Sequence, residues 1–201
     1  MMAVRTTKDL PREYREAAQI NLQSNKKELL LVNGGAILIA VVMAVIGLLC
    51  VPITTFFDID SPKPAILRIC VMLLGMLAYI VLHEVVHLVF MRAFCREVKP
   101  TFGFTGIYAY AASRAYFNRR DYLIVGLSPV VFWGIVLIVL NILVPRPWFW
   151  VIYFIQTINV SGAAGDLYVA VRMLRMPNTL LVQDDGVSMR VYLPKKKKTR
   201  K

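Results

Sequence analysis

Cysteine and histidine are both scarce in this chain of 201 residues, which contains three cysteines and only two histidines. Cys50, Cys70 and Cys95 are odd in number and lack CxxC spacing, which argues against a disulfide framework and against a cysteine zinc site. We expect these thiols to be ordinary apolar packing residues. Charge is absent from long stretches as well, because residues 29–51 and 122–144 contain no Asp, Glu, Lys, Arg or His.

Each uncharged stretch exceeds the roughly 20 residues with which an α-helix crosses a bilayer. Residues 69–91 and 148–171 are similarly long and mostly apolar, although they contain ionisable groups. Together the four segments predict an all-α polytopic membrane protein with four transmembrane helices. Small cytoplasmic β-hairpins complete the predicted fold, since residues 98–112 and 179–193 combine β-prone runs with central glycines.

Basic residues outnumber acidic ones by 24 to 12, giving a formal net charge of +12. They crowd residues 1–28, 92–120 and 172–201, so the positive-inside rule predicts a multi-pass cell-membrane protein with both termini in the cytoplasm. The basic residues of the first segment precede the first apolar run, which argues against a cleavable signal peptide. For the basic tail we expect contact with anionic lipid headgroups rather than with nucleic acid.

Three regions are predicted on this basis. Residues 1–28 form a cytoplasmic segment whose helix-like pattern suggests that it lies on the membrane surface. Residues 29–175 form a four-helix transmembrane domain with a cytoplasmic hairpin at about 96–120, and residues 176–201 form a second hairpin and the basic tail. The hairpins either cap the helix ends or offer a sheet edge that binds an extended substrate by strand addition.

Both histidines fall in His83-Glu84-Val85-Val86-His87, an HExxH pattern inside the apolar segment 69–91. Residues four apart share one face of a helix, so both imidazoles can bind one zinc ion while Glu84 reaches a water beside it. Ionisable groups within hydrocarbon are costly unless they have a function there. The alternative is a pair of core histidines that only hydrogen-bond to neighbouring helices. We favour a metal site that supports hydrolysis.

A catalytic zinc usually takes three protein ligands, and no third histidine exists. The third ligand must then be a carboxylate or, less favourably, a cysteine at the same membrane depth. Asp166 lies six residues before the predicted helix end near Arg172, a height comparable with those of His83 and His87 before Arg92. Asp166 is thus the predicted third ligand. Asn159 lies on nearly the same face seven residues earlier, where it could orient a ligand, contact substrate or simply join helices.

These motifs resemble the bacterial integral-membrane zincin peptidase families, which are related in layout to site-2 proteases. The resemblance rests on the HEVVH sequence at residues 83–87, the segment 159–167 with its Gly-Asp-Leu, the Gly-Leu-Ser-Pro stretch at 126–129 and the Phe-Gly-Phe at 102–104. It implies one zinc ion per chain at His83 and His87, Glu84 as catalytic acid and base, and Asp166 as the third ligand. The chain differs from site-2 proteases in having no proline between Asn159 and Asp166.

The predicted function is a zinc metallopeptidase in the membrane that hydrolyses membrane or membrane-proximal protein substrates near the cytoplasmic face. Two non-enzymatic alternatives stay open. In the first, the same residues form the transport site of a small divalent-metal carrier. In the second, a zincin-like scaffold binds membrane clients without cutting them. Manganese, iron or cobalt can occupy a similar ligand set, depending on supply.

Overall fold

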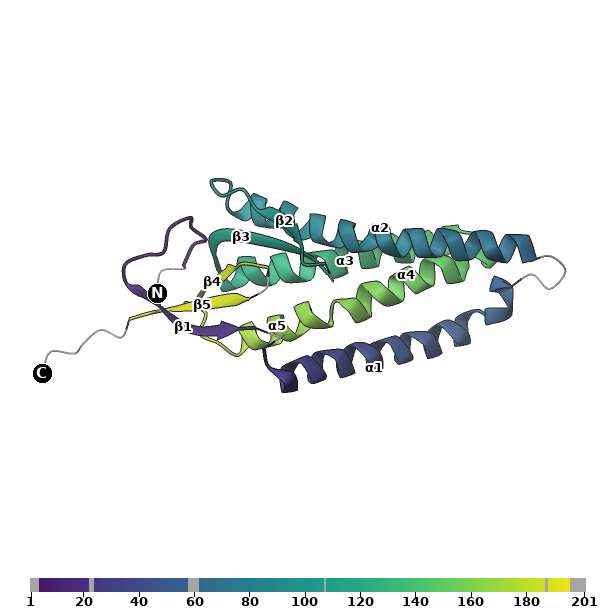
Figure 1. Ribbon diagram of the computed structural model, residues 1–201, viewed down its shortest axis with the longest axis horizontal. Helices are drawn as coiled ribbons and strands as arrows, with labels where there is room; N and C mark the ends of the chain where they lie inside the picture. Colours follow the sequence, from purple (N-terminus) through teal and green to yellow (C-terminus); the bar gives the residue numbers. More distant parts are fainter. Residues whose placement is uncertain (1–3, 22–23, 58–61, 107, 187, 196–201) are drawn as a thin grey trace, which may run out of the picture.

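The computed structural model describes residues 4–21, 24–57, 62–106, 108–186 and 188–195. The described chain contains five α-helices, two short 3-10 turns and five β-strands. The helices run roughly parallel to the long axis of the molecule, and the strands gather at one end of it (Figure 1). The part of the predicted basic tail beyond residue 195 lies outside the described residues.

Three helices have the length and apolarity to cross a membrane: α1 (Lys26–Cys50), α2 (Pro62–Phe94) and α3 (Arg119–Leu143). Many of their large apolar side chains are exposed, and the most apolar 18-residue stretch of α1 buries no residue at all. Exposed apolar surface on this scale is typical of a protein surrounded by lipid rather than by water. These three helices therefore indicate a membrane protein.

The prediction that residues 148–171 form a fourth transmembrane helix is wrong. Residues 148–171 instead contribute to two shorter helices, α4 (Phe149–Gly162) and α5 (Ala164–Leu174), separated at Ala163. With 14 and 11 residues, neither helix reaches the length needed to span a bilayer. Ala163 itself is completely buried. Irregular backbone at membrane depth is tolerated where protein surrounds it, which hydropathy alone does not reveal.

The prediction of an all-α fold is also wrong, because the strands form one five-stranded antiparallel sheet. Its strands are β1 (Tyr14–Ile20), β2 (Thr101–Phe104), β3 (Ala109–Asn118), β4 (Leu181–Asp184) and β5 (Met189–Pro194), in the order β1-β5-β4-β3-β2. Strands do fall in both segments where hairpins were expected. The pairing of β3 with β4 joins those hairpins, and such long-range pairing leaves no mark in a local sequence pattern.

Strand β1 replaces the surface helix expected near the N-terminus. It pairs with β5, and its register shifts between Glu16 and Ala18. The bulge inserts one residue, so Tyr14 and Ile20 pack into different hydrophobic clusters although they are six positions apart, a spacing that places residues on the same face of a regular strand. This change of face disrupts the two-residue alternation by which a strand is recognised in a sequence.

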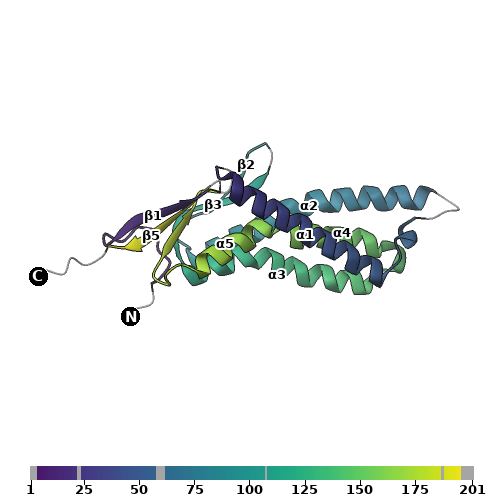
Figure 2. The ribbon, with the colours of Figure 1, turned by 90° about the horizontal axis from the view of Figure 1, so that it is seen from below.

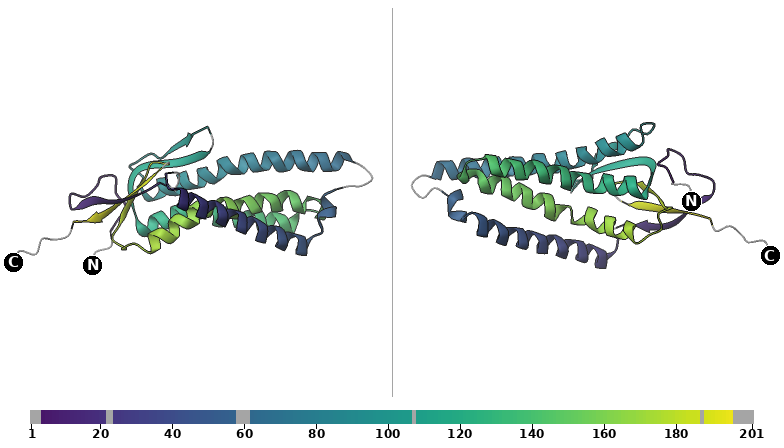
Figure 3. Two further views of the ribbon diagram at one scale, coloured as in Figure 1. Left: turned by 60° about the horizontal axis from the view of Figure 1, so that its bottom comes forward. Right: turned by 180° about the vertical axis from the view of Figure 1, so that it is seen from behind.

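The sheet sits at the end of the bundle where α2 ends and α3 begins (Figures 2 and 3). A buried apolar cluster joins the two parts there, with Met91 from α2, Phe117 from β3, Val125 from α3, Met173 from α5 and Val182 from β4. This cluster places β3 against the C-terminal half of α2. That half carries both histidines.

Candidate metal centre

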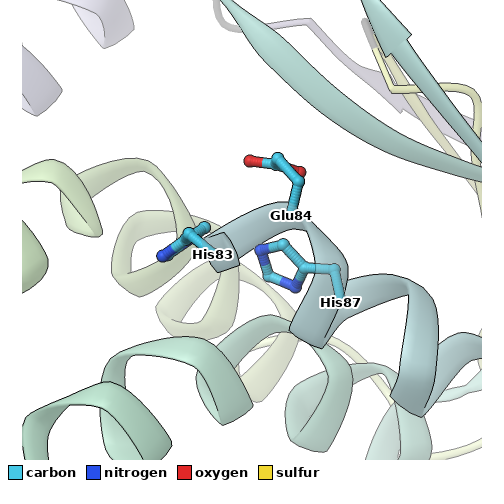
Figure 4. Close-up of side chains that lie close together, drawn as sticks. All are labelled: His83, Glu84 and His87. Carbon is cyan, nitrogen blue, oxygen red and sulfur yellow. The ribbon is translucent and has the colours of Figure 1, made fainter. Parts of the chain in front are cut away.

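His83 and His87 lie one turn apart on the same face of α2, with their ring centroids 4.9 Å apart. His87 is buried, with 8% of its surface exposed, and His83 is partly buried. Glu84 leaves the helix beside the two imidazoles (Figure 4). One ligand atom from each of the three side chains falls within 4.8 Å of the others, a spacing at which they could hold a metal ion.

Asp166 approaches both histidines from a different helix. The break at Ala163 starts α5 immediately afterwards, so Asp166 occupies the first turn, where the helix dipole favours a negative charge. Its Oδ2 atom lies 3.3 Å from His83 Nε2 and 3.9 Å from His87 Nε2. Zinc bonds of about 2.0–2.2 Å in a tetrahedron place ligand atoms roughly 3.3–3.6 Å apart. Both distances to Asp166 Oδ2 match this spacing within about 0.5 Å.

Hydrogen bonds determine which nitrogen of His87 carries its proton. His87 Nδ1 lies 2.9 Å from the backbone oxygen of Val125 in α3. A carbonyl oxygen can only accept a hydrogen bond, so Nδ1 donates and carries the proton in neutral His87. The lone pair of Nε2 then faces Asp166.

A short relay does the same for His83. Its Nδ1 lies 2.8 Å from the hydroxyl oxygen of Tyr79, and that hydroxyl donates to Asn159 Oδ1 at 2.8 Å. Because the Tyr79 proton is directed at Asn159, the Tyr79 oxygen accepts from His83 Nδ1. Asn159 Nδ2 donates to the Val130 carbonyl at 3.1 Å, which fixes the orientation of the amide. His83 Nε2 is therefore also unprotonated in the neutral ring.

The donor set fits a divalent cation. His83 Nε2 and His87 Nε2 both lie within 3.9 Å of Asp166 Oδ2, and in the neutral rings both nitrogens carry a lone pair. Lone pairs this close repel one another unless a proton or a cation lies between them. Two neutral imidazoles and one carboxylate are a common ligand set of catalytic zinc. The Nδ1 atoms of His83 and His87 each have a hydrogen-bond partner, as is usual for histidines that bind a metal through Nε2.

Glu84 has a different environment from the three candidate ligands. Its carboxylate accepts a hydrogen bond from the backbone of Ala111 in β3. It also lines a cavity of about 270 Å³ between the helices and the sheet, together with His87 and Asp166. Glu84 is thus next to the candidate ligands and faces a space that a substrate could enter.

Asn159 is completely buried and does not line this cavity. Its amide contacts Tyr79 on α2 and the Val130 backbone on α3, so it acts on the site through other groups. Of the roles considered for Asn159, orientation of a ligand and joining of helices agree with these contacts.

The sequence did not predict Asp184, a third carboxylate that lines the same cavity. Asp184 Oδ2 accepts from the Tyr122 hydroxyl at 2.6 Å, and Oδ1 accepts from the backbone nitrogen of Gly186 at 2.8 Å. Burial raises the pKa of Asp184, although both hydrogen bonds oppose the shift. The Asp-Asp-Gly turn identified the hairpin in the sequence, but only the packing of β4 against α3 brings Asp184 to the cavity.

A family model described as putative zincin peptidase matches residues 76–181, more than half of the chain. The chain belongs to this family. The resemblance to zincin peptidases inferred from the sequence is thereby confirmed, whereas the likeness to site-2 proteases stays a prediction. No significant match was found among curated proteins or among solved structures.

The part of the chain that matches the zincin peptidase family contains every site residue that the sequence predicted. It begins at Met76, within α2, and ends at Leu181, the first residue of β4. His83, Glu84, His87, Asn159 and Asp166 all lie inside it, and Asp184 lies just beyond it. Family membership and the His-Glu-His group together support a metallopeptidase function and a bound metal, for which zinc is the usual ion.

Proposed function

We propose that this protein is a membrane-embedded zinc metallopeptidase that hydrolyses peptide bonds of membrane or membrane-proximal proteins near the cytoplasmic face. The observation that carries the proposal is the convergence of Asp166 on His83 and His87 from a separate helix. Simple helix packing does not require a carboxylate at this place. Two imidazoles and a carboxylate beside a cavity that Glu84, His87 and Asp166 line form the minimum set for metal-assisted hydrolysis.

His83, His87 and Asp166 would hold the zinc ion, which supplies Lewis acidity for attack on the scissile carbonyl. Glu84 takes a proton from the attacking water and delivers it to the leaving amine. The hydrogen bond from Ala111 orients the Glu84 carboxylate within the cavity. Glu84 can perform this role only if it stays free of the metal, which agrees with Asp166 being the third ligand.

Tyr79 and Asn159 position His83 in this proposal. The relay from Asn159 through Tyr79 keeps the proton of His83 on Nδ1 and its Nε2 directed at Asp166. Loss of such an outer hydrogen bond typically weakens metal binding by about 10- to 100-fold. Tyr79 and Asn159 are therefore positioning residues.

Strand β3 offers a place for an extended substrate. Its residues Ala109 to Ala112 pair with β2 on one side, whereas its ladder to β4 begins only at Ser113. Within the described chain, no strand pairs with the other side of this stretch. Three of its four residues line the cavity beside Glu84, so a substrate that adds as a strand here would pass the candidate metal centre.

The basic residues at the helix ends support the proposed orientation in the membrane. Arg92 lies in the last turn of α2, Arg119 begins α3, and Arg172 lies in the last turn of α5. All three ends meet the sheet at one end of the bundle (Figures 1 and 2). By the positive-inside rule we infer that the sheet and the candidate site lie on the cytoplasmic side, as predicted for both termini.

The decisive test is metal content after purification in a mild detergent, measured by mass spectrometry. We expect about one zinc ion per wild-type chain and none in His87→Ala or Asp166→Ala. Glu97→Gln removes an exposed carboxylate near the end of α2 and serves as the matched control. Absence of metal from the wild type even after zinc reconstitution would refute the peptidase and leave a zincin-like scaffold. Cleavage of membrane peptides is assayed next.

A further inference from the structure

A proline occupies the interior of α3 beside the candidate metal centre. Pro129 is fully buried in this helix. Proline has no backbone N–H, so it cannot donate the usual helical hydrogen bond to the carbonyl four residues earlier. That carbonyl belongs to Val125, the residue whose oxygen accepts the hydrogen bond from His87.

The Val125 oxygen is a buried acceptor that needs partners. Val125 is 1% exposed, and an unpaired buried carbonyl is unfavourable. Two side chains take the place of the missing N–H: His87 Nδ1 at 2.9 Å and the Ser128 hydroxyl at 2.9 Å. The proline thus makes a backbone acceptor on α3 available to a side chain on α2.

We propose that Pro129 is a positioning residue of the metal centre, because its missing N–H reserves the Val125 carbonyl for His87. The hydrogen bond keeps the proton on Nδ1 and leaves Nε2 directed at Asp166. This inference rests on the metal site of the proposed function but requires no proteolysis. It also differs from the kink that a helix proline usually produces, since the important property is a missing donor rather than a bend.

Pro129→Ala tests this role because alanine restores the N–H at position 129. The new donor competes with His87 for the Val125 oxygen, so we expect the zinc dissociation constant, measured by chelator competition, to rise about 10-fold. Alanine also favours a helix far more than proline does, so thermal unfolding of the zinc-free protein should be unchanged or shifted upward. A proline needed only for packing would instead lower thermal stability and zinc affinity together.

Nitrogen-15 NMR of labelled histidine reports the same hydrogen bond directly. Only two histidines occur in the chain, so the spectrum is simple and His87→Ala assigns it. In the wild type, with or without zinc, we expect His87 to be protonated at Nδ1. The hydrogen bond to the Val125 carbonyl should change the chemical shift of this proton. Pro129→Ala should weaken this shift. An unchanged His87 signal and zinc affinity within twofold of wild type would overturn the proposal.

An ester at position 129, introduced as the α-hydroxy analogue of alanine, is the matched control. It keeps the alanine side chain but lacks the N–H, so we expect near wild-type zinc affinity. An ester variant as weak as Pro129→Ala would assign the effect to ring shape and overturn the proposal. Ser128→Ala removes the other donor to Val125 and should bind zinc at least as tightly as wild type.

If Pro129→Ala does not fold, an ester at position 126 provides the test, because it weakens the Val125 carbonyl as an acceptor. We expect weaker zinc binding and a weaker His87 shift, and wild-type values for both would overturn the proposal. Failure of the proposed function is recognised separately. A wild type that binds no zinc refutes the metallopeptidase, while the NMR comparison of zinc-free proteins still decides whether Pro129 reserves the Val125 carbonyl for His87.

Discussion

Helix α1 and the α4–α5 segment are both long, apolar stretches, yet only the second is broken. Helix α1 stays continuous through Gly34 and Gly35, where an added Cβ would meet nothing within 4 Å. The second segment breaks at Ala163, which is completely buried. Glycine content therefore does not explain the break. Backbone facing lipid must keep its own hydrogen bonds, whereas backbone enclosed by protein can depart from the helix.

The polar side chains follow the same division. Asn159 and Asp166 lie on either side of the break and contact groups on α2, whereas the most apolar stretch of α1 buries no residue. The break starts a new helix at Ala164 and so brings Asp166 into its first turn. In this protein the interrupted segment contributes to the candidate site, and the continuous one forms lipid-facing surface. The following predictions test that division, beginning with the largest effect.

Asp166→Ala should reduce bound zinc from about one ion per chain to almost none, because a ligand bond is lost. Asp184→Asn tests whether any carboxylate in the cavity is enough. Asp184 lines the same cavity but is bonded to Tyr122 and Gly186, so we expect that variant to retain its metal. Mass spectrometry of the purified proteins provides the measurement. If both variants lost the same amount of zinc, Asp166 would not be a more important ligand than Asp184, and the helix break would have no particular role in binding the metal.

Glu84→Gln should lower peptide hydrolysis by about 10²- to 10⁴-fold, the usual contribution of a general acid or base. The amide cannot accept the proton of the attacking water, but the three ligands are intact, so bound zinc should stay near one ion per chain. Glu97→Gln, at an exposed position, should cleave at the wild-type rate. A Glu84→Gln protein that still cleaves normally would exclude Glu84 as the base.

Tyr79→Phe should raise the zinc dissociation constant about 10-fold, because His83 loses the partner of its Nδ1–H. Asn159→Leu removes the next member of the relay and should weaken zinc binding less than Tyr79→Phe does. Asn159→Asp keeps an acceptor for the Tyr79 hydroxyl, so its zinc affinity should lie between those of Asn159→Leu and the wild type. Chelator competition measures all three. If Tyr79→Phe binds zinc like the wild type, the relay from Asn159 through Tyr79 does not support the metal site. The broken segment would then contribute only Asp166.

Gly47→Ala should destabilise the protein by about 1–3 kcal/mol, since overpacking is costly. The added Cβ would lie 2.5 Å from Tyr153 Cε1 and 2.9 Å from Trp150 Cη2, both on α4. Gly34→Ala on the same helix meets nothing and should stabilise it by up to about 1 kcal/mol. Thermal unfolding in detergent compares the two. Similar behaviour would show that α1 does not pack on α4 near Gly47.

Asp184 predicts a smaller, pH-dependent effect outside the helices. Burial raises its pKa in the folded state, so the stability that its protonation contributes is complete at low pH and is lost as the pH rises through that pKa. Asn cannot ionise. The advantage of wild type over Asp184→Asn in thermal unfolding of the zinc-free protein should therefore shrink as the pH rises above about 4, the usual pKa of a free aspartate. A constant difference would show that the surroundings of Asp184 do not raise its pKa.

Part of the fold and most of the candidate site were accessible from local patterns. Long apolar runs, two of them without charge, identified the three long helices, because lipid requires about 20 apolar residues in any context. HExxH and Asp166 were recognisable because ionisable groups are rare within apolar segments. Tyr79 could have been found as well, since it lies four residues before His83 on the same helix face. Strand β1 could not, because its bulge hides the alternation.

The sequence by itself determined the membrane class, the family and the chemical types of the candidate ligands. These properties depend on composition and on spacing within one helix, and the family match confirms the family. Tertiary structure decided the five-stranded sheet, the break at Ala163 and the partners of both histidines. Each of these depends on contacts between residues far apart in the chain. Pro129 depends on both sequence and tertiary structure. Its missing N–H is evident in the sequence, but only the packing of α2 against α3 brings His87 to the Val125 carbonyl that the proline leaves free.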